Sequence, residues 1–169
     1  IDLLLIEPSL DFKSDQEEII NRRVEPDLPH DESPYLAVGY MIANAQRNGL
    51  SVKFLDMIAY SLSVDDVIQY IKEWNPMVIG FSAYTIKIKC IGMISEAIKN
   101  VFPNVLICCG GAHVNALPKE TLDEFEAIDF IVCGEADEII VGIINNIKNN
   151  KHIHEIPYIV TRQSDKYTR

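Results

Sequence analysis

Basic residues are scarce in this chain of 169 residues, which contains 15 lysines and arginines against 25 aspartates and glutamates. The formal net charge of −10 argues against nucleic acid as a partner, because phosphate binding is driven by lysine and arginine. No apolar run approaches the roughly 20 residues that cross a bilayer, so no membrane span is expected. The first residues also lack the charge pattern of a signal peptide. We therefore expect a cytoplasmic protein.

Cysteine pairs with metal-binding spacing are absent. The adjacent Cys108 and Cys109 and the isolated Cys90 and Cys133 form no Cys-x-x-Cys pair. The Cys-x-x-x-Cys-x-x-Cys motif that holds a four-iron cluster is also missing. Three of the four cysteines lie in apolar runs, where a free cysteine behaves as a small hydrophobic side chain. We expect structural cysteines in a reducing compartment.

Several nucleotide-binding motifs are missing as well. No Gly-x-Gly-x-x-Gly follows the first apolar segment, and no Gly-x-x-x-x-Gly-Lys-Ser/Thr loop occurs anywhere. The residues after that segment, 7–10, do not form the hydroxyl- and glycine-rich phosphate loop of a flavodoxin. The third apolar segment ends in Ser82, where a phosphotransfer receiver needs an aspartate. Dinucleotide binding, nucleotide hydrolysis and phosphotransfer are therefore not expected.

The chain does contain a regular alternation of short apolar runs and amphipathic segments. Helical spacing between the runs predicts helices that separate consecutive strands. This alternation predicts one α/β domain over 1–169, with an open, mostly parallel five-stranded sheet covered by helices on both faces. Pro157 to Thr161 is a candidate for an added edge strand. The strands are expected at 3–6, 52–55, 77–82, 105–109 and 129–133.

The ends of the strands carry the candidate binding residues, because ligands of such sheets lie beyond the carboxyl ends, where the strand order reverses. A long loop at 7–34 follows the first strand, and loops of this length are usually functional or disordered. Paired glycines let a ligand approach the backbone, and free N–H groups at a helix start bind polar ligand atoms. These features predict a long groove formed by Ser82-Ala83-Tyr84-Thr85, Gly110-Gly111-Ala112-His113 and Gly134-Glu135-Ala136-Asp137.

These segments resemble the N-terminal cobalamin-binding domain of cobalamin-dependent radical S-adenosylmethionine enzymes. That family includes methyltransferases and the anaerobic oxidative cyclase of magnesium-protoporphyrin monomethyl ester. The resemblance extends over nearly the whole chain and implies a flavodoxin-like, Rossmann-like cobalamin-binding fold. It rests on Pro34–Tyr40, Asn48–Val52, Val78–Ser82, Cys109–His113 and Asp129–Glu135.

The resemblance implies that the chain is the cobalamin-binding module of a larger enzyme. The chain has no initiator methionine, and we expect it to be a fragment whose radical domain, its partner in the same polypeptide, follows residue 169. The parent protein would also hold a four-iron four-sulfur cluster and S-adenosylmethionine. It would catalyse methyl transfer or a related radical reaction on a tetrapyrrole or lipid, while this chain alone would bind cobalamin without catalysis.

The resemblance also implies roles for single residues. Ser82 and Thr85 would hydrogen-bond the dimethylbenzimidazole tail of cobalamin, which leaves the cobalt in the base-off form and enters the groove. Gly110 and Gly111 would let the tail pass close to the fourth strand, and we expect Gly111→Leu to abolish cobalamin retention while leaving the fold intact. The other cofactor contacts are assigned to Ser9, Tyr84, Ala112, His113, Gly134 and Glu135.

Two departures from related cobalamin domains affect these roles. The Asp-x-His-x-x-Gly motif whose histidine ligates cobalt in mutases and methionine synthase is absent. His30 is the nearest substitute ligand, but the expected state leaves the lower axial position without a protein imidazole. The hydroxyl residues are spaced Ser-x-x-Thr rather than Ser-x-Leu-x-Thr, so the role of Thr85 is less secure than that of Ser82.

Two alternative hypotheses remain. A Rossmann-like docking or substrate-positioning domain would keep the fold and bind no cobalamin. A free-standing enzyme would use Glu7, His113 and Glu135 at the strand ends, but no nucleophile–base spacing supports it. Retention of hydroxocobalamin with a base-off spectrum separates the cobalamin module from the docking domain.

Overall fold

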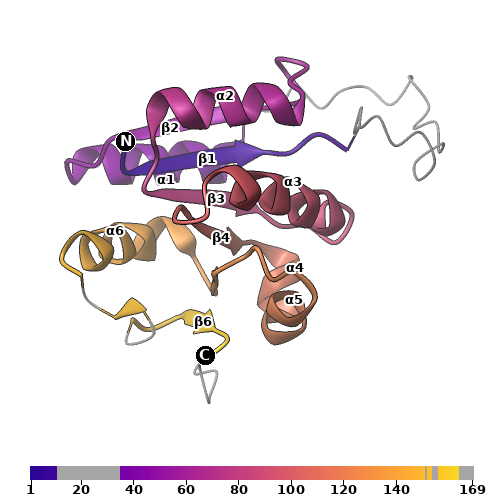
Figure 1. The fold of residues 1–169 in the computed structure, drawn as a ribbon. Helices are drawn as coiled ribbons and strands as arrows, with labels where there is room; N and C mark the ends of the chain where they lie inside the picture. The colour runs from indigo at the N-terminus through magenta and orange to yellow at the C-terminus, as the bar shows by residue number, and fades with distance from the viewer. Residues whose placement is uncertain (11–34, 151, 154–155, 164–169) are drawn as a thin grey trace.

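The computed structural model describes residues 1–10, 35–150, 152–153 and 156–163 (Figure 1). Most of the loop predicted at 7–34 lies outside these residues. The helices and strands follow one another along the chain in the alternation that the sequence predicts. They are β1 (Leu3–Glu7), α1 (Leu36–Arg47), β2 (Val52–Asp56), α2 (Val64–Trp74), β3 (Val78–Ser82), α3 (Ile88–Val101), β4 (Leu106–Gly110), α4 (Ala112–Ala116), α5 (Pro118–Glu124), β5 (Phe130–Val132), α6 (Ala136–Lys148) and β6 (Ile159–Thr161).

One six-stranded sheet with the order β2-β1-β3-β4-β5-β6 forms the centre of the domain. The first five strands are parallel, as predicted, and β6 pairs antiparallel with β5 as the added edge strand. Strand order reverses at β1, whose neighbours β2 and β3 lie on opposite sides of it. In sheets of this flavodoxin-like order, ligands bind at that reversal, beyond the carboxyl ends of the strands.

Two helical layers cover the sheet, because successive side chains of each strand point to opposite faces (Figure 1). Ile79 and Ile107 belong to the core on the face covered by α2 and α3. Val78 and Cys108 belong to the core on the other face, which α1 and α6 cover. Burial on both faces explains why the strands are continuous apolar runs rather than alternating ones.

Local signals set several helix ends. Ser63 accepts a hydrogen bond from the backbone N–H of Asp66 at 3.2 Å, and the Asp66 carboxylate accepts one from the Ser63 N–H at 2.9 Å. This capping box begins α2. Pro118 occupies the first turn of α5, where its missing N–H is not needed for a helical hydrogen bond. Within the described residues, every helix is too short or too polar to cross a bilayer.

Candidate functional site

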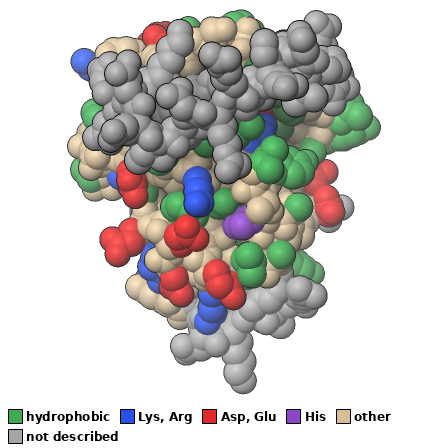
Figure 2. Space-filling model, turned by 90° about the vertical axis from the view of Figure 1, so that its right-hand side faces the viewer, with side chains coloured by type: hydrophobic (Ala, Val, Ile, Leu, Met, Phe, Trp, Pro, Cys, Tyr) green, Lys and Arg blue, Asp and Glu red, His purple; other side chains and the backbone are tan. Residues whose placement is uncertain are grey.

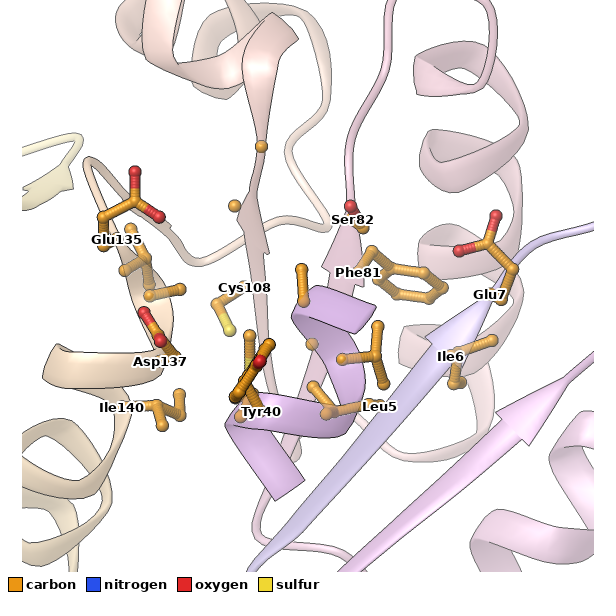
Figure 3. Close-up of a pocket in the computed structure, with 18 of the residues that line it drawn as sticks. Leu5, Ile6, Glu7, Tyr40, Phe81, Ser82, Cys108, Glu135, Asp137 and Ile140 are labelled. Atoms are coloured by element: carbon orange, nitrogen blue, oxygen red, sulfur yellow. The ribbon is translucent and has the colours of Figure 1, made fainter. Parts of the chain in front are cut away.

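A slot with a volume of about 440 Å³ opens at the carboxyl ends of β1, β3, β4 and β5, between α1 and α6 (Figure 3). Its size lies within the roughly 300–1,000 Å³ of typical small-molecule sites. Apolar side chains form most of its walls, and carboxylates and hydroxyls lie among them. Six of the predicted cofactor contacts line it: Ser82, Tyr84, Gly110, Gly111, Gly134 and Glu135.

The slot has two levels, which follow from strand register. Ser82 pairs with Gly110, and we call these two residues the upper row. Leu5 pairs with Gly80, which pairs with Cys108, and we call these three residues the lower row. The two rows are separated by two residues along each strand, or about 6–7 Å. Because parallel strands end at the same edge, the upper row lies at the mouth of the slot and the lower row lies deeper.

Small residues on two neighbouring strands explain why this part of the sheet is hollow. A Cβ atom added at Gly80 would lie 3.0 Å from Leu5 Cδ2 and 3.6 Å from Cys108 Sγ. A Cβ atom at Gly110 would lie 3.7 Å from both the Ala136 Cβ and the Val132 carbonyl oxygen. A glycine inside a strand weakens the strand and often marks the close approach of a ligand. Here, two such glycines lie on one face of adjacent strands.

Helices α1 and α6 form the walls of the slot and are joined to each other. The side-chain amide of Asn44 on α1 donates a hydrogen bond of 2.5 Å to the carbonyl of Asp137 on α6. The N-terminus of α6 borders the mouth, and no side chain of the described ranges caps it at Glu135. Its first N–H groups are therefore available to polar ligand atoms. The Ser82 hydroxyl is likewise engaged by no hydrogen bond within the described part of the chain.

A buried ion pair lies beside the upper row. Glu7, at the end of β1, is 2% exposed, and Lys87, just before α3, donates a hydrogen bond to its carboxylate. Burial raises the pKa of Glu7, and the hydrogen bond and positive charge of Lys87 act in the opposite direction. Sequence reasoning considered Glu7 only as an enzyme residue and did not identify Lys87, which lies 80 residues further along the chain. The pair neutralises a carboxylate that lines the slot.

The other predicted contacts that the structure describes do not line the slot: Ser9, Thr85, Ala112 and His113. Thr85 Oγ1 and His113 Nδ1 lie 3.2 Å apart and form a hydrogen bond with each other. Ala112 and His113 belong to the short helix α4, which directly follows β4. His30 lies outside the described residues.

Gly111 lines the slot, but the backbone geometry of its turn also requires a glycine. Its φ of +108° is strained for residues with a side chain, and an added Cβ would lie 3.0 Å from both the N and O atoms of Ala83. The Ala83 carbonyl also accepts the His113 N–H, so it is held in place. The expectation that Gly111→Leu leaves the fold intact is therefore wrong.

Gly80 and Cys108 are two of the lining residues that the sequence did not reveal. Both lie in the middle of strands, whereas the sequence argument considered only the residues after each strand. A glycine inside an otherwise apolar strand is the signal that points to the slot. All four cysteines are free and buried, which confirms that they are not exposed thiols. Burial raises the pKa of Cys108 to about 12, so its thiol stays neutral.

The exposed surface around the mouth is partly apolar. Leu36, Tyr40 and Tyr84 line the slot and are 67%, 68% and 54% exposed. Viewed from the side toward which β1 points, hydrophobic and acidic side chains lie close together (Figure 2). Large apolar side chains gathered at a cavity mouth indicate that a further surface or ligand covers them. No group of three or more metal-ligating side chains occurs in the described ranges.

Comparison of the sequence with models of protein families gives one match that covers most of the chain. A family model described as the B12 binding domain matches residues 32–144. The chain belongs to this family. The cofactor of this domain is cobalamin, so the resemblance of the sequence to cobalamin-binding domains is confirmed. The match begins just before α1 and ends within α6, and it includes β3, β4 and β5, three of the four strands that border the slot.

Curated relatives of this B12-binding domain are longer enzymes. An uncharacterized methyltransferase, PH0819, of Pyrococcus horikoshii is 26% identical over 133 residues, which are 79% of this chain and 29% of the relative. The cytidylyl-2-hydroxyethylphosphonate methyltransferase of Streptomyces wedmorensis is 27% identical over 157 residues, covering 82% of this chain and 29% of the relative. The anaerobic magnesium-protoporphyrin IX monomethyl ester cyclase of Cereibacter sphaeroides is 26% identical over 108 residues. This chain spans less than a third of each.

Two solved structures share the fold. The radical S-adenosylmethionine methyltransferase TsrM from Kitasatospora setae matches 99% of this chain with a TM-score of 0.69 and 18% identity, over 29% of its own length. The cobalamin-dependent S-adenosylmethionine radical enzyme OxsB, solved with aqua-cobalamin bound, matches 94% with a TM-score of 0.71 and 16% identity, over 20% of its length. The predicted α/β fold is therefore confirmed, including its similarity to cobalamin-binding domains.

Proposed function

We propose that this B12-binding domain is the cobalamin-binding module of a larger radical S-adenosylmethionine enzyme. We further propose that its slot receives the dimethylbenzimidazole tail of base-off cobalamin. One observation carries the proposal: a row of small residues on adjacent strands opens a deep, apolar slot at the reversal of strand order. A flat bicyclic base on a ribose-phosphate stem suits a narrow slot with polar groups at its mouth.

Different residues of the slot would contact different parts of this tail. Gly80 and Cys108 would leave room for the base between the sheet and the two helices. The free Ser82 hydroxyl would hydrogen-bond the base or its sugar, and the uncapped start of α6 would bind the polar stem. The apolar side chains at the mouth, including Tyr40 and Tyr84, would lie against the much larger corrin ring. Thr85 and His113, which bond each other, would support this rim from outside.

The lower axial position of cobalt is proposed to have no histidine ligand from this domain. No histidine lines the slot in the described part of the chain, and His113 is engaged by Thr85. Bound cobalamin supplies the cobalt chemistry of methyl transfer or a related radical reaction. This chain supplies position and environment.

The rest of the proposed enzyme lies outside this chain. Relatives named as methyltransferases and as a cyclase are more than three times as long as the matched part. We propose that the parent protein holds a four-iron four-sulfur cluster and S-adenosylmethionine in a radical domain after residue 169, and that it acts in the cytoplasm. The buried free cysteines suit that reducing compartment.

A binding experiment tests the proposal. The protein is mixed with hydroxocobalamin, freed of excess ligand on a desalting column and examined by absorption spectroscopy. We expect a coloured complex with a base-off spectrum. Ala37→Leu places bulk in the slot from α1 and should weaken retention, whereas Ala43→Leu on an exposed part of the same helix should not. A colourless wild-type protein would refute cobalamin binding and favour the docking domain.

A further inference from the structure

Polarity is distributed unevenly between the two levels of the slot (Figure 3). The side-chain oxygens of Glu7, Ser82 and Glu135 lie toward the mouth, whereas those of Tyr40 and Asp137, which also line the slot, are drawn nearer the level of Cys108. The lower row offers only aliphatic groups and the Cys108 thiol, and Ile140 lies next to it one turn further along α6 than Ala136. A ligand group that reaches the lower row therefore finds only aliphatic groups and a thiol on the side of the sheet.

The chemistry of this lower level bears on the choice among cobalamin-like cofactors. Corrinoids share the corrin ring but differ in the tail base, which can be a benzimidazole or a purine such as adenine. A purine carries ring nitrogens and an amino group that form hydrogen bonds with water. Burying a polar group without replacing its hydrogen bonds to water costs free energy. The dimethylated benzene ring of dimethylbenzimidazole makes no such hydrogen bonds and therefore loses none on burial.

We propose that the lower row selects corrinoids with an apolar aromatic tail base and discriminates against purine bases. The inference rests on the proposed function, because it requires the tail to enter the slot. Cys108 is central to it, since its side chain is the one heteroatom-bearing group of the lower row. A neutral thiol is a weak donor and a weak acceptor, so it cannot replace the hydrogen bonds of a purine.

Three ligands test the selection: cobalamin, the analogue with an adenine tail, and cobinamide, which has no tail base. Dissociation constants are measured by absorption titration of the purified protein. We expect cobalamin to bind roughly ten-fold or more tightly than the adenine analogue, as the loss of one buried hydrogen-bonding group predicts. Cobinamide should bind more weakly than cobalamin, because it leaves the slot without a tail.

A pair of matched variants tests whether Cys108 is responsible for the preference for cobalamin over the adenine analogue. Cys108→Ser keeps the size of the side chain and adds a hydroxyl to the lower row, so it should narrow the ratio between cobalamin and the adenine analogue several-fold. Cys109→Ser makes the same change at the next residue, which is buried on the opposite face of β4, and should leave the ratio unchanged. Cys108→Thr provides a second hydroxyl variant if Cys108→Ser does not fold.

The outcomes separate this inference from the proposed function. Equal affinity for cobalamin and the adenine analogue, both well above that for cobinamide, would overturn the selection while leaving tail insertion in place. An unchanged ratio in the folded Cys108 variants would also overturn it. Equal affinity for cobalamin and cobinamide would refute tail insertion itself, and absence of all binding would refute the proposed function.

Discussion

The two faces of β3 and β4 differ in how completely side chains fill the space between the sheet and its helices. On β3 and β4, the face toward α2 and α3 carries Ile79, Ile107 and Cys109, all fully buried. Toward the strand ends, the alternate residues on the face toward α1 and α6 are Gly80, Ser82, Cys108 and Gly110, and they leave a slot of about 440 Å³. One face is built for stability and the other forms a cavity, which shows that alternate residues of one strand can serve different purposes.

The largest expected effect comes from filling the hollow face. Cys108→Leu projects extra volume into the slot and should weaken cobalamin binding about 100-fold or more, or about 2.8 kcal/mol. Its stability should change little, because the added methyl groups occupy open space. Titration with hydroxocobalamin and urea unfolding measure the two effects.

The matched variant Cys109→Leu should behave in the opposite way. It places the same bulk on the filled face and should lower the free energy of unfolding by about 1–3 kcal/mol through overpacking. Cobalamin affinity of the folded protein should stay near that of the wild type. Equal effects of the two variants on binding would contradict the division between the faces.

The next effect concerns the turn at the end of β4. Gly111→Leu should destabilise the fold by about 1–3 kcal/mol, because a side chain at this positive φ is strained and meets the Ala83 backbone. Gly110→Ala is the control, since its added Cβ makes only ordinary contacts at 3.7 Å. Urea unfolding of both variants measures the difference, and equal stability would show that the Gly111 turn tolerates a side chain.

A smaller effect on cobalamin binding is expected when a single hydroxyl is removed from the slot face, and none when one is removed from the filled face. Ser82→Ala should weaken cobalamin binding by about 1 kcal/mol, the usual value of one hydrogen bond, without loss of stability. Ser95 on α3 is fully buried, and its hydroxyl has no hydrogen-bond partner among the residues that the structure describes. Ser95→Ala should therefore leave binding unchanged and keep or raise stability. A loss of binding with Ser95→Ala would contradict the assignment of the site to one face.

The smallest effect is a dependence of stability on pH. Burial raises the pKa of Glu7 above its ordinary value of 4.5, so the folded protein holds this proton more firmly than the unfolded chain. The linked contribution to stability is present below the unfolded pKa and is lost as pH rises through the folded pKa. Replacing both partners, Glu7→Gln with Lys87→Met, should remove this decline from unfolding free energies measured between pH 4 and 7. A decline that persists in the double variant would assign it to another group.

Much of the fold follows from the sequence alone. Continuous apolar runs such as Val78–Ser82 predict strands buried on both faces, and Pro118 and the Ser63–Asp66 pair mark helix starts. The mouth of the site was also predictable, because glycines and hydroxyls follow the strands. The depth of the slot at Gly80 and Cys108 was not predictable, because it depends on which strands pair and in which register.

The remaining differences come from contacts between distant segments. The partner of Glu7 lies 80 residues away, and no local pattern links the two. Thr85 and His113 lie 28 residues apart in the sequence and bond each other rather than facing the slot. The geometric need for Gly111 depends on the Ala83 backbone of the neighbouring strand end. Each of these contacts requires the folded sheet.

The most direct test of the central claim is a set of nuclear Overhauser contacts between bound cobalamin and the protein. Cobalt(III) cobalamin is diamagnetic, so the methyl and aromatic protons of its tail base can be observed in complex with a methyl-labelled sample. We predict contacts from these protons to the methyl groups of Leu5 and Ile140 in the slot, and none to those of Ile79 and Ile107 on the filled face. Tightly retained cobalamin without contacts to Leu5 and Ile140 would contradict the account.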